Sequence, residues 1–355
     1  MKNIKFFILW VIRCKQNFQP SSMRKHILFL AMLLSLITLK GQDIHFSQFF
    51  NAPLTLNPAE TGSFDGSFRA TAIYRSQWAS LNSPYKTFSS SYDHIFKWGL
   101  APGDYTSGGM MMYSDKAGDA NYTTTYVTLS GAYHKPIRDN QLLTFGLQFG
   151  YWQQKFESDK LYFADQFDGN SFTNKTTAEN FQSQIQNKYD LNIGLRYAYT
   201  VNDDVSLHAG AAVNHLTFIK NSFKGNQDER LALAYRGDIG MDYRLNEKIV
   251  VSPKIYFAQQ SRAIELTLGS EASYLLETEK FTGTLYAGIF YRTRDAIYPY
   301  IAVKYNDMKI GLSYDATISG LTPYNGARGG FEISFQYIGF IKPTPLTIVV
   351  PCIRI

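Results

Sequence analysis

Apolar and polar residues alternate with a period of two along most of the chain after Ser67. In residues 191–199 the odd positions read Leu, Ile, Leu, Tyr and Tyr, whereas the even positions read Asn, Gly, Arg and Ala. This period places one set of side chains on each face of a β-strand. The same pattern recurs in residues 143–151, 233–243, 285–291, 310–318 and 331–337. The chain is therefore expected to fold as an all-β protein.

Segments of this kind predict about fourteen strands. Most are about 9 to 13 residues long, which is long for a soluble sheet and suits tilted strands that cross a bilayer. An open sheet edge is not tolerated in lipid, so the expected fold is a closed transmembrane antiparallel β-barrel. The predicted strands are residues 67–75, 85–93, 107–114, 122–134, 142–153, 189–200, 205–216, 232–243, 249–259, 264–276, 281–292, 297–305, 308–319 and 329–338.

Charged residues indicate which face of these strands is turned inward. They fall on the polar register, and a cation on the lipid face at mid-bilayer would cost about 2 to 4 kcal/mol. The polar register is therefore expected to face the lumen, while tyrosines near strand ends fit interfacial girdles. The inward charges are Arg196, Arg236, Asp238, Asp242, Arg244, Glu265, Glu271, Arg292, Asp315 and Glu332.

Connection lengths predict the orientation of the barrel, because outer-membrane barrels have short periplasmic turns and longer extracellular loops. Residues 94–106 are an exception, since they are too long for the periplasmic turn that their position requires. The expected turns are residues 135–141, 201–204, 245–248, 277–280 and 306–307. The expected extracellular loops are residues 154–188, 217–230 and 320–328.

The first 41 residues predict a signal peptide, with Met23 as an alternative start codon that would make residues 1–22 an upstream mis-start. Arg24 and Lys25 precede an apolar stretch over residues 27–39, which is too short to span a bilayer. A retained anchor helix is the alternative. The remaining expected parts are a periplasmic N-terminal strap or plug over 42–66, the barrel over 67–340 and a C-terminal tail over 341–355.

The net charge of +6 comes from the leader and not from the predicted barrel. Residues 1–41 hold seven of the 35 cationic residues and no acidic residue, which leaves 28 cations against 29 anions. The exported part thus lacks a basic surface for phosphate contacts, which argues against nucleic-acid binding. Two cysteines, Cys14 and Cys352, provide neither a disulfide framework nor metal-ligand spacing.

A soluble periplasmic β-sandwich or propeller is the competing interpretation, because strands also alternate in these folds. No internal repeat of fixed period supports a propeller. Long strands with aromatic residues on one face and charges on the other favour the membrane barrel.

Short motifs give the sequence a family resemblance. They include Ser47-Gln48-Phe49, Leu56-Asn57-Pro58-Ala59, Tyr74-Arg75-Ser76-Gln77-Trp78, Ser91-Tyr92-Asp93 and Gly311-Leu312-Ser313-Tyr314-Asp315. Their order closely resembles the PorP/SprF family of outer-membrane proteins of the type IX secretion system in Bacteroidetes. The chain departs from the family at Glu60-Thr61 and at its end, Cys352-Ile353-Arg354-Ile355.

The resemblance implies a non-enzymatic accessory component of type IX secretion in the cell outer membrane. Such a component supports export or surface attachment of proteins with C-terminal sorting domains, including adhesins of gliding motility. Its implied partners are the secreted client, other parts of the secretion machinery and outer-membrane lipid. The family-motif positions are Asn57, Pro58, Tyr74, Arg75, Trp78, Tyr92, Asp93, Tyr314 and Asp315.

Two segments are candidates for partner contact. The long loop 154–188 carries aromatic residues that either anchor a client domain or pack onto the barrel mouth. Residues 42–65 either plug the lumen, dock a partner or form an ordinary lead-in, while 74–78 fits a strand end with an interfacial Trp. The aromatic candidates are Phe156, Tyr162, Phe163, Phe167 and Phe172.

No catalytic, cofactor-binding or metal-binding motif is recognised. The exported histidines are His45, His94, His134, His208 and His215, which lie in separate segments. Two alternatives to the secretion role remain open. The charged lumen would also suit a diffusion channel for small solutes, and distant strands could assemble a Ser/His lipid hydrolase.

Overall fold

The computed structural model describes residues 43–79, 84–118, 120–173, 177–179, 184–218, 223, 230–278 and 281–341. The expected signal peptide and the expected tail beyond Ile341 lie outside these residues. In the part of the chain that is described, no helix is both long and apolar enough to cross a membrane.

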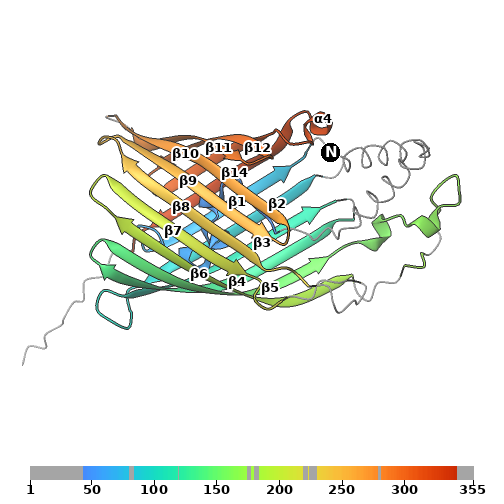
Figure 1. Cartoon of the computed structure of the whole chain (residues 1–355), viewed down its shortest axis with the longest axis horizontal. Helices are drawn as coiled ribbons and strands as arrows, with labels where there is room; N and C mark the ends of the chain where they lie inside the picture. Colours follow the sequence, from blue (N-terminus) through green and yellow to red (C-terminus); the bar gives the residue numbers. More distant parts are fainter. Residues whose placement is uncertain are drawn as a thin grey trace, which may run out of the picture. The chain divides into compact units, whose positions relative to one another are not determined.

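Fourteen antiparallel strands close into one barrel, in which β1 pairs with β14 (Figure 1). The predicted fold and strand count are confirmed, and each predicted strand lies within a few residues of an observed one. The strands are β1 (Phe68–Gln77), β2 (Tyr85–Phe96), β3 (Tyr105–Ala117), β4 (Tyr122–Arg138), β5 (Gln141–Lys155), β6 (Ile185–Thr200), β7 (Val205–Asn214), β8 (Ala234–Arg244), β9 (Ile249–Gln260), β10 (Ala263–Thr278), β11 (Phe281–Arg292), β12 (Ala296–Tyr305), β13 (Met308–Thr317) and β14 (Arg328–Gly339).

The two ends of the barrel differ in their connections. At one end, here called the loop end, β5 and β6 are joined by residues 156–184, β7 and β8 by 215–233, and β13 and β14 by 318–327. The other, the turn end, has short connections except for residues 97–104. By the loop-length rule, the loop end faces the cell exterior and the turn end faces the periplasm. Short helices lie in two of the loops: η3 (Ser158–Lys160), η4 (Ala164–Gln166) and α4 (Thr322–Asn325).

Burial alternates along the strands as the sequence predicts. Apolar side chains such as Leu129, Ile239 and Ile301 are exposed on the outer face, whereas Asp190 and Glu332 are buried inside. The outer face thus presents hydrocarbon to lipid, and the inner face carries the charges. Arg244, at the end of β8, is exposed and therefore contributes no buried lumenal charge.

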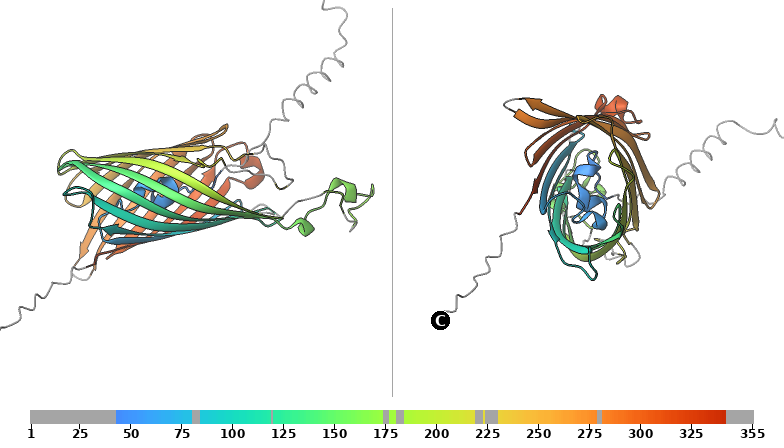
Figure 2. Two further views of the ribbon diagram at one scale, coloured as in Figure 1. Left: turned by 90° about the horizontal axis from the view of Figure 1, so that it is seen from below. Right: turned by 90° about the vertical axis from the view of Figure 1, so that its left-hand side faces the viewer.

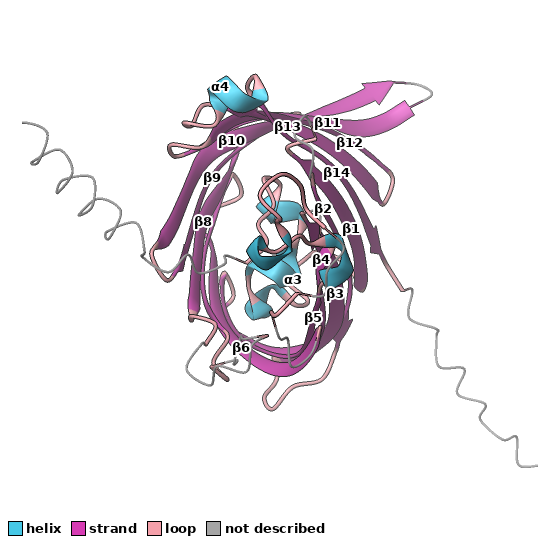
Figure 3. Ribbon diagram, turned by 90° about the vertical axis from the view of Figure 1, so that its right-hand side faces the viewer, coloured by secondary structure: helices cyan, strands magenta, loops and turns pink. Residues whose placement is uncertain are grey.

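Residues 43–66, here called the strap, lie inside the barrel (Figures 2 and 3). They form three short helices: η1 (Phe49–Asn51), α3 (Pro53–Leu56) and η2 (Pro58–Glu60). Proline opens both α3 and η2, where its fixed φ suits a first helical position and its missing N–H is not needed. The Asn57 side chain accepts the Ala59 N–H at the start of η2. The sequence therefore breaks the strap into short turns that fit a narrow lumen.

The hydrophobic core lies between the strap and the barrel wall. Strap residues Phe49 and Leu56 pack with Tyr256, Phe290 and Tyr298 in one cluster. Phe49 stacks on Tyr256 with ring centroids 4.9 Å apart. A second cluster surrounds strap residue Leu54 and contains Met111, Tyr113, Tyr126 and Trp152. Burial of these aromatic rings requires the strap, so the strap is part of the folded core.

The strap runs along the lumen from the loop end to the turn end. Asp43 lies beside Gln260, at the loop end of β9, whereas the Gly62 N–H donates to Asp93 near the turn end of β2. β1 then begins at the turn end. The periplasmic strap that the sequence predicts stays a prediction, and within the barrel the first described residues of the strap lie at the loop end. Polar groups of the strap hydrogen-bond to the wall near both ends of the barrel and between them. These bonds hold the strap along the whole lumen.

This path predicts that the N-terminal end of the strap, at Asp43, is reached from outside the cell. An epitope tag inserted between Gln42 and Asp43 should bind antibody on intact cells. The same tag between Asn246 and Glu247, in a turn at the turn end, should bind only after permeabilisation. Staining of the N-terminal tag only after permeabilisation would contradict the path.

Candidate functional site

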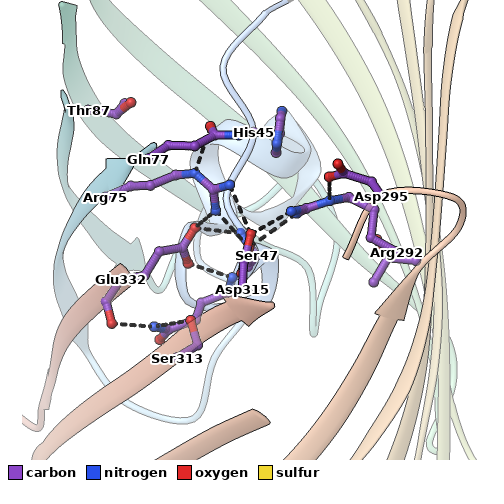
Figure 4. Close-up of polar contacts among 12 residues, drawn as sticks. His45, Ser47, Arg75, Gln77, Thr87, Arg292, Asp295, Ser313, Asp315 and Glu332 are labelled. Carbon is purple, nitrogen blue, oxygen red and sulfur yellow. Dashed lines mark hydrogen bonds and ion pairs between the residues drawn. The ribbon is translucent and has the colours of Figure 1, made fainter. Parts of the chain in front are cut away.

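The strap is fixed near the loop end by five buried residues, here called the Arg75 cluster: Ser47, Arg75, Arg292, Asp315 and Glu332 (Figure 4). Arg75 forms an ion pair with Glu332 and another with Asp315, at 3.0 Å. Arg292 Nη2 lies 2.5 Å from the same Asp315 carboxylate. The Ser47 hydroxyl donates to Asp315 at 2.7 Å, and the Ser47 N–H donates to Glu332 at 2.7 Å. One strap residue thereby contacts both carboxylates.

The charges of the Arg75 cluster balance, with two guanidinium groups facing two carboxylates. The side chains of Arg75, Arg292, Asp315 and Glu332 are all at most 4% exposed. Removing one member of a buried ion pair typically costs about 3 to 5 kcal/mol, because the other charge stays buried without its partner. The cluster therefore holds together as a unit.

The Arg75 cluster also lies across the closure of the barrel. Arg75 on β1 is directly opposite Glu332 on β14, the two strands that join the ends of the sheet. Asp315 belongs to β13, next to β14, and Arg292 to β11. The Gln48 N–H adds a bond of 2.8 Å to Glu332. The strap therefore bonds to side chains on both sides of the β1–β14 junction.

A second group, the His215 cluster, fixes the first described residue of the strap. His215 Nε2 lies 2.8 Å from Asp43, and its Nδ1 lies 2.8 Å from Asp190 of β6. Arg236 Nη2 contacts Asp43 at 3.0 Å. An imidazolium that donates from both nitrogens satisfies both carboxylates.

Asp43 and His215 lie beyond the strand ends, and each favours the charged form of the other. Burial alone would lower the pKa of His215, but the charge of Asp43 and hydrogen bonds to both carboxylates raise it to about 9. Burial alone would raise the pKa of Asp43, yet His215 and Arg236 lower it to about 2. Both groups are therefore charged at neutral pH, and the contact is an ion pair.

A third group of contacts lies nearer the turn end. Arg69 donates to both oxygens of Asp93, at 3.0 and 2.7 Å, and to the Glu60 carbonyl at 2.8 Å. Arg196 Nε lies 2.7 Å from the Glu60 carboxylate. Glu60, at a position where this chain departs from the family pattern, is therefore paired within the lumen.

The Asn57-Pro58 motif packs against two glycines of the wall, Gly146 and Gly194. The Asn57 amide donates to the Leu195 carbonyl at 2.9 Å. A Cβ at Gly146 would lie 2.3 Å from the Ala59 nitrogen, and one at Gly194 would lie 1.8 Å from the Asn57 side-chain oxygen. Glycine is required at both positions because the strap backbone approaches the strands so closely.

The remaining family-motif residues divide by register. Arg75, Asp93 and Asp315 point inward and bind the strap, whereas their neighbours Tyr74, Tyr92 and Tyr314 are exposed on the outer face. Trp78 follows β1 with a φ of 54° and meets Tyr85 edge-on at 5.2 Å. This fits the expected aromatic residue at a strand end.

The sequence did not identify the set of residues through which the strap and the wall bind each other: Asp43 and Ser47 of the strap, and Arg69, Glu332 and His215 of the barrel. Glu332 was recognisable as an inward charge, and Ser47 belonged to a family motif. Their pairing had no local signal, because Ser47 and Glu332 are 285 residues apart. Asp43 of the strap and Arg69 of the wall each have an oppositely charged partner, but charge alone does not identify which partner that is.

A serine and a histidine do meet on the wall, though not as an accessible dyad. Ser107 Oγ lies 2.8 Å from His134 Nε2, and Thr144 Oγ1 lies 3.0 Å from His134 Nδ1. The Ser107 hydroxyl donates to the Thr61 carbonyl of the strap at 2.6 Å. Both residues are buried. The strap therefore covers the hydroxyl that a hydrolase would need as nucleophile, so the arrangement serves to hold the strap.

Space remains in the lumen beside the strap. A cavity of about 230 Å³ is lined by strap residues such as Phe50 and by wall residues including Lys254, Glu271 and Lys309. Lys254 forms an ion pair with Glu271 and lies 4.6 Å from the centre of the Phe50 ring. Among the described residues, no group of three or more His, Cys, Asp or Glu side chains is arranged to hold a metal ion.

The five aromatic candidates of the long loop do not form one group. Tyr162 and Phe167 both contact Phe172, with centroids 5.3 and 5.2 Å from it, and all three are exposed. Phe163 is half-buried at the start of η4. Phe156 is only 8% exposed and meets Phe223 edge-on at 4.9 Å. Phe156 therefore packs at the barrel mouth, the alternative that the sequence left open.

The contacts of the Arg75 cluster predict that the wild-type barrel gives no large, steady conductance in a planar bilayer. The Glu332→Gln variant should show frequent brief openings, because Arg75 loses one of its two anionic partners and the strap is bound less firmly. Ser47→Ala, which leaves all the wall charges in place, should have a weaker effect in the same direction.

Asp203→Asn, at an exposed turn, is the matched control and should behave as wild type. Folding of each variant is checked by its heat-modifiable gel mobility. Steady large currents from the wild type, or identical traces from wild type and folded Glu332→Gln, would contradict the role given to the cluster.

Solved structures with a similar arrangement are outer-membrane barrels. The toluene transporter TodX of Pseudomonas putida has a TM-score of 0.50 and 11% identity, over 81% of this chain and 93% of that chain. The translocator domain of the autotransporter NalP from Neisseria meningitidis has a TM-score of 0.42 and 11% identity, over 78% and 90%. The KdgM porin has a TM-score of 0.35 and 10% identity, over 76% and 98%. At 11% identity, the likeness to TodX concerns the fold alone.

The sequence comparisons give the family. No curated protein matched the chain. The model of the family described as type IX secretion system membrane protein PorP/SprF matches residues 38–337, which include the strap and nearly the whole barrel. Three wall residues of the motifs, Arg75, Asp93 and Asp315, bind the strap, and the fold is an outer-membrane barrel. The chain therefore belongs to the PorP/SprF family of type IX secretion system membrane proteins.

Proposed function

We propose that this chain is a non-enzymatic accessory component that supports export or surface attachment of clients with C-terminal sorting domains, gliding adhesins among them. Membership of a type IX secretion family supports the general role. The observation that carries the specific proposal is the strap. A lumen occupied from Asp43 to Gly62 leaves no passage for a protein, so a client would be held at the loop end.

The exposed aromatic residues of the long loop are the proposed contact. Tyr162, Phe167 and Phe172, here called the Tyr162 patch, lie at the tip of the loop that joins β5 and β6. Exposed aromatic residues that lie in contact with each other are typical anchors of protein interfaces. Tyr162 is 66% exposed, so little of the ring is used in packing the free protein.

The backbone around the Tyr162 patch is fixed by short-range hydrogen bonds. Asp168 accepts the N–H groups of Asn170 and Ser171 at 2.9 and 2.8 Å. The Thr173 N–H donates to the Gln166 carbonyl at 2.8 Å, across the narrow turn that brings Phe167 and Phe172 together. A patch that is ordered before binding loses less conformational entropy when a partner arrives.

A diffusion channel for small solutes is the alternative function. The charged wall and the cavity beside the strap support it. The buried ion pairs that bind the strap argue against it. They belong to the Arg75 cluster, the His215 cluster and the contacts of Arg69 and Arg196. The conductance of wild type and Glu332→Gln separates the two functions.

The proposal predicts that Phe167→Ala combined with Phe172→Ala reduces surface attachment of a reporter fused to a C-terminal sorting domain from the same genome. The expected loss is at least about tenfold, because truncation of an interface anchor typically costs 2 kcal/mol or more. Reporter on intact cells is measured by flow cytometry and normalised to the amount of barrel in the outer membrane.

Tyr324→Ala is the matched control. Tyr324 is 79% exposed and lies in α4, within a different connection of the same end. Its loss should leave attachment within about twofold, as expected for an exposed residue outside an interface core. Equal attachment by wild type and the double variant would exclude the Tyr162 patch as the contact.

A further inference from the structure

The connection between β2 and β3 differs from the other described connections at the turn end. It has eight residues, 97–104, whereas β4 and β5 are joined by residues 139–140 and β12 and β13 by 306–307. Residues 97–103 are all exposed. Their side chains are mostly apolar, with Trp98 at 67% and Leu100 at 91% exposure. Two residues are enough to join neighbouring strands at this end, so the additional residues between β2 and β3 are not needed for the turn itself.

The connection is ordered, and its apolar side chains are held away from the barrel. The Thr106 hydroxyl donates to the Trp98 carbonyl at 3.1 Å, and the Asp104 N–H donates to the Ala101 carbonyl at 3.1 Å. The Asp104 carboxylate is buried and accepts the Tyr133 hydroxyl. Gly103 has a φ of 88°, a conformation that favours glycine. Residues 97–104 therefore have a defined conformation, and that conformation leaves their apolar side chains exposed.

The apolar side chains continue the lipid-facing surface of the barrel. On β2, Phe88, Tyr92 and Phe96 are exposed on the outer face. Trp98 follows Phe96 with the same parity, and their rings lie 6.4 Å apart. On β4, which pairs with β3, Ile137 is exposed at the β-bulge near the end of the strand. Through Trp98, the hydrophobic surface thus continues past the end of β2.

Cationic groups surround this apolar extension. Lys97 precedes Trp98, and Lys135 and Arg138 flank Ile137 at the end of β4. All three residues are exposed, and Lys135 lies 3.9 Å from the buried Asp104 carboxylate. A Trp with apolar neighbours and nearby cations suits the boundary between acyl chains and phosphate headgroups.

We propose that residues 97–104, together with Ile137 and its flanking cations, form an interfacial anchor in the phospholipid leaflet at the turn end. Trp98 and Leu100 insert at the headgroup boundary, while Lys97, Lys135 and Arg138 contact lipid phosphates. Lipid is the occupant because the apolar side chains extend a surface that already faces lipid. The anchor fixes the depth of the β2–β4 side of the barrel in the membrane.

Trp98 fluorescence tests the proposal in the refolded full barrel, reconstituted into phosphatidylethanolamine and phosphatidylglycerol vesicles. Subtracting the spectrum of Trp98→Phe isolates the emission of Trp98. Acyl chains brominated near the headgroup should remove about half or more of this emission, which should be blue-shifted as for an interfacial Trp. The buried lumenal Trp152 should be quenched far less. Trp98 emission that bromine leaves unchanged and aqueous iodide quenches would overturn the anchor.

Two further measurements address the charges and the occupant. Lys97→Gln combined with Arg138→Gln should weaken bromine quenching of Trp98 in anionic vesicles and have less effect without phosphatidylglycerol. Equal quenching of this variant and the parent in anionic vesicles would overturn the phosphate contacts. A photoreactive residue at Leu100 should cross-link to lipid in intact cells. A single protein adduct in place of lipid would overturn the anchor and identify the surface as a protein-docking site.

Discussion

Buried charge on the inner wall is the constraint on which the rest of this structure depends. Arg75, Arg292, Asp315 and Glu332 are nearly inaccessible to solvent, so each must find an opposite charge or a hydrogen-bonding group inside the protein. The wall charges pair among themselves, and the strap supplies the remaining donors and acceptors through Ser47 and Gln48. The same requirement recurs at His215 and at Arg69. The strap is therefore the polar core of the barrel as well as part of its hydrophobic core.

This constraint links closure of the barrel to occupation of the lumen. The contact between Arg75 and Glu332 spans the junction of β1 and β14, and the strap bonds to the same pair. Closing the sheet and docking the strap thus use the same side chains. The close approach of Asn57 and Pro58 to Gly146 and Gly194 adds a steric fit that a longer side chain on the wall would prevent. The proposed client contact lies at the loop end, because the lumen is already occupied.

Sequence reasoning predicted the barrel closely because a period of two is a local property that every strand repeats. It also predicted the inward register of buried charges such as Asp315 and Glu332, since the cost of a charge in lipid does not depend on tertiary detail. It could not predict that Ser47 meets Glu332, because that pairing exists only after the sheet closes. It could not predict that the strap starts at the loop end, because the direction of a chain through a lumen is set by contacts such as Asp43 with His215. The exposed Trp98 and Leu100 lay in the one connection whose length disagreed with the predicted topology.

A disulfide between strap and wall tests the central claim, occupation of the lumen by the strap, most directly. Thr61 Oγ1 and Ser130 Oγ lie 2.9 Å apart, and both side chains are short, so cysteines at these positions are placed for bonding. In a Cys352→Ser background, Thr61→Cys with Ser130→Cys should form the bond in the outer membrane of growing cells. Peptide mass spectrometry should then find the two segments joined. Two free thiols that react with maleimide in the folded barrel would contradict the account.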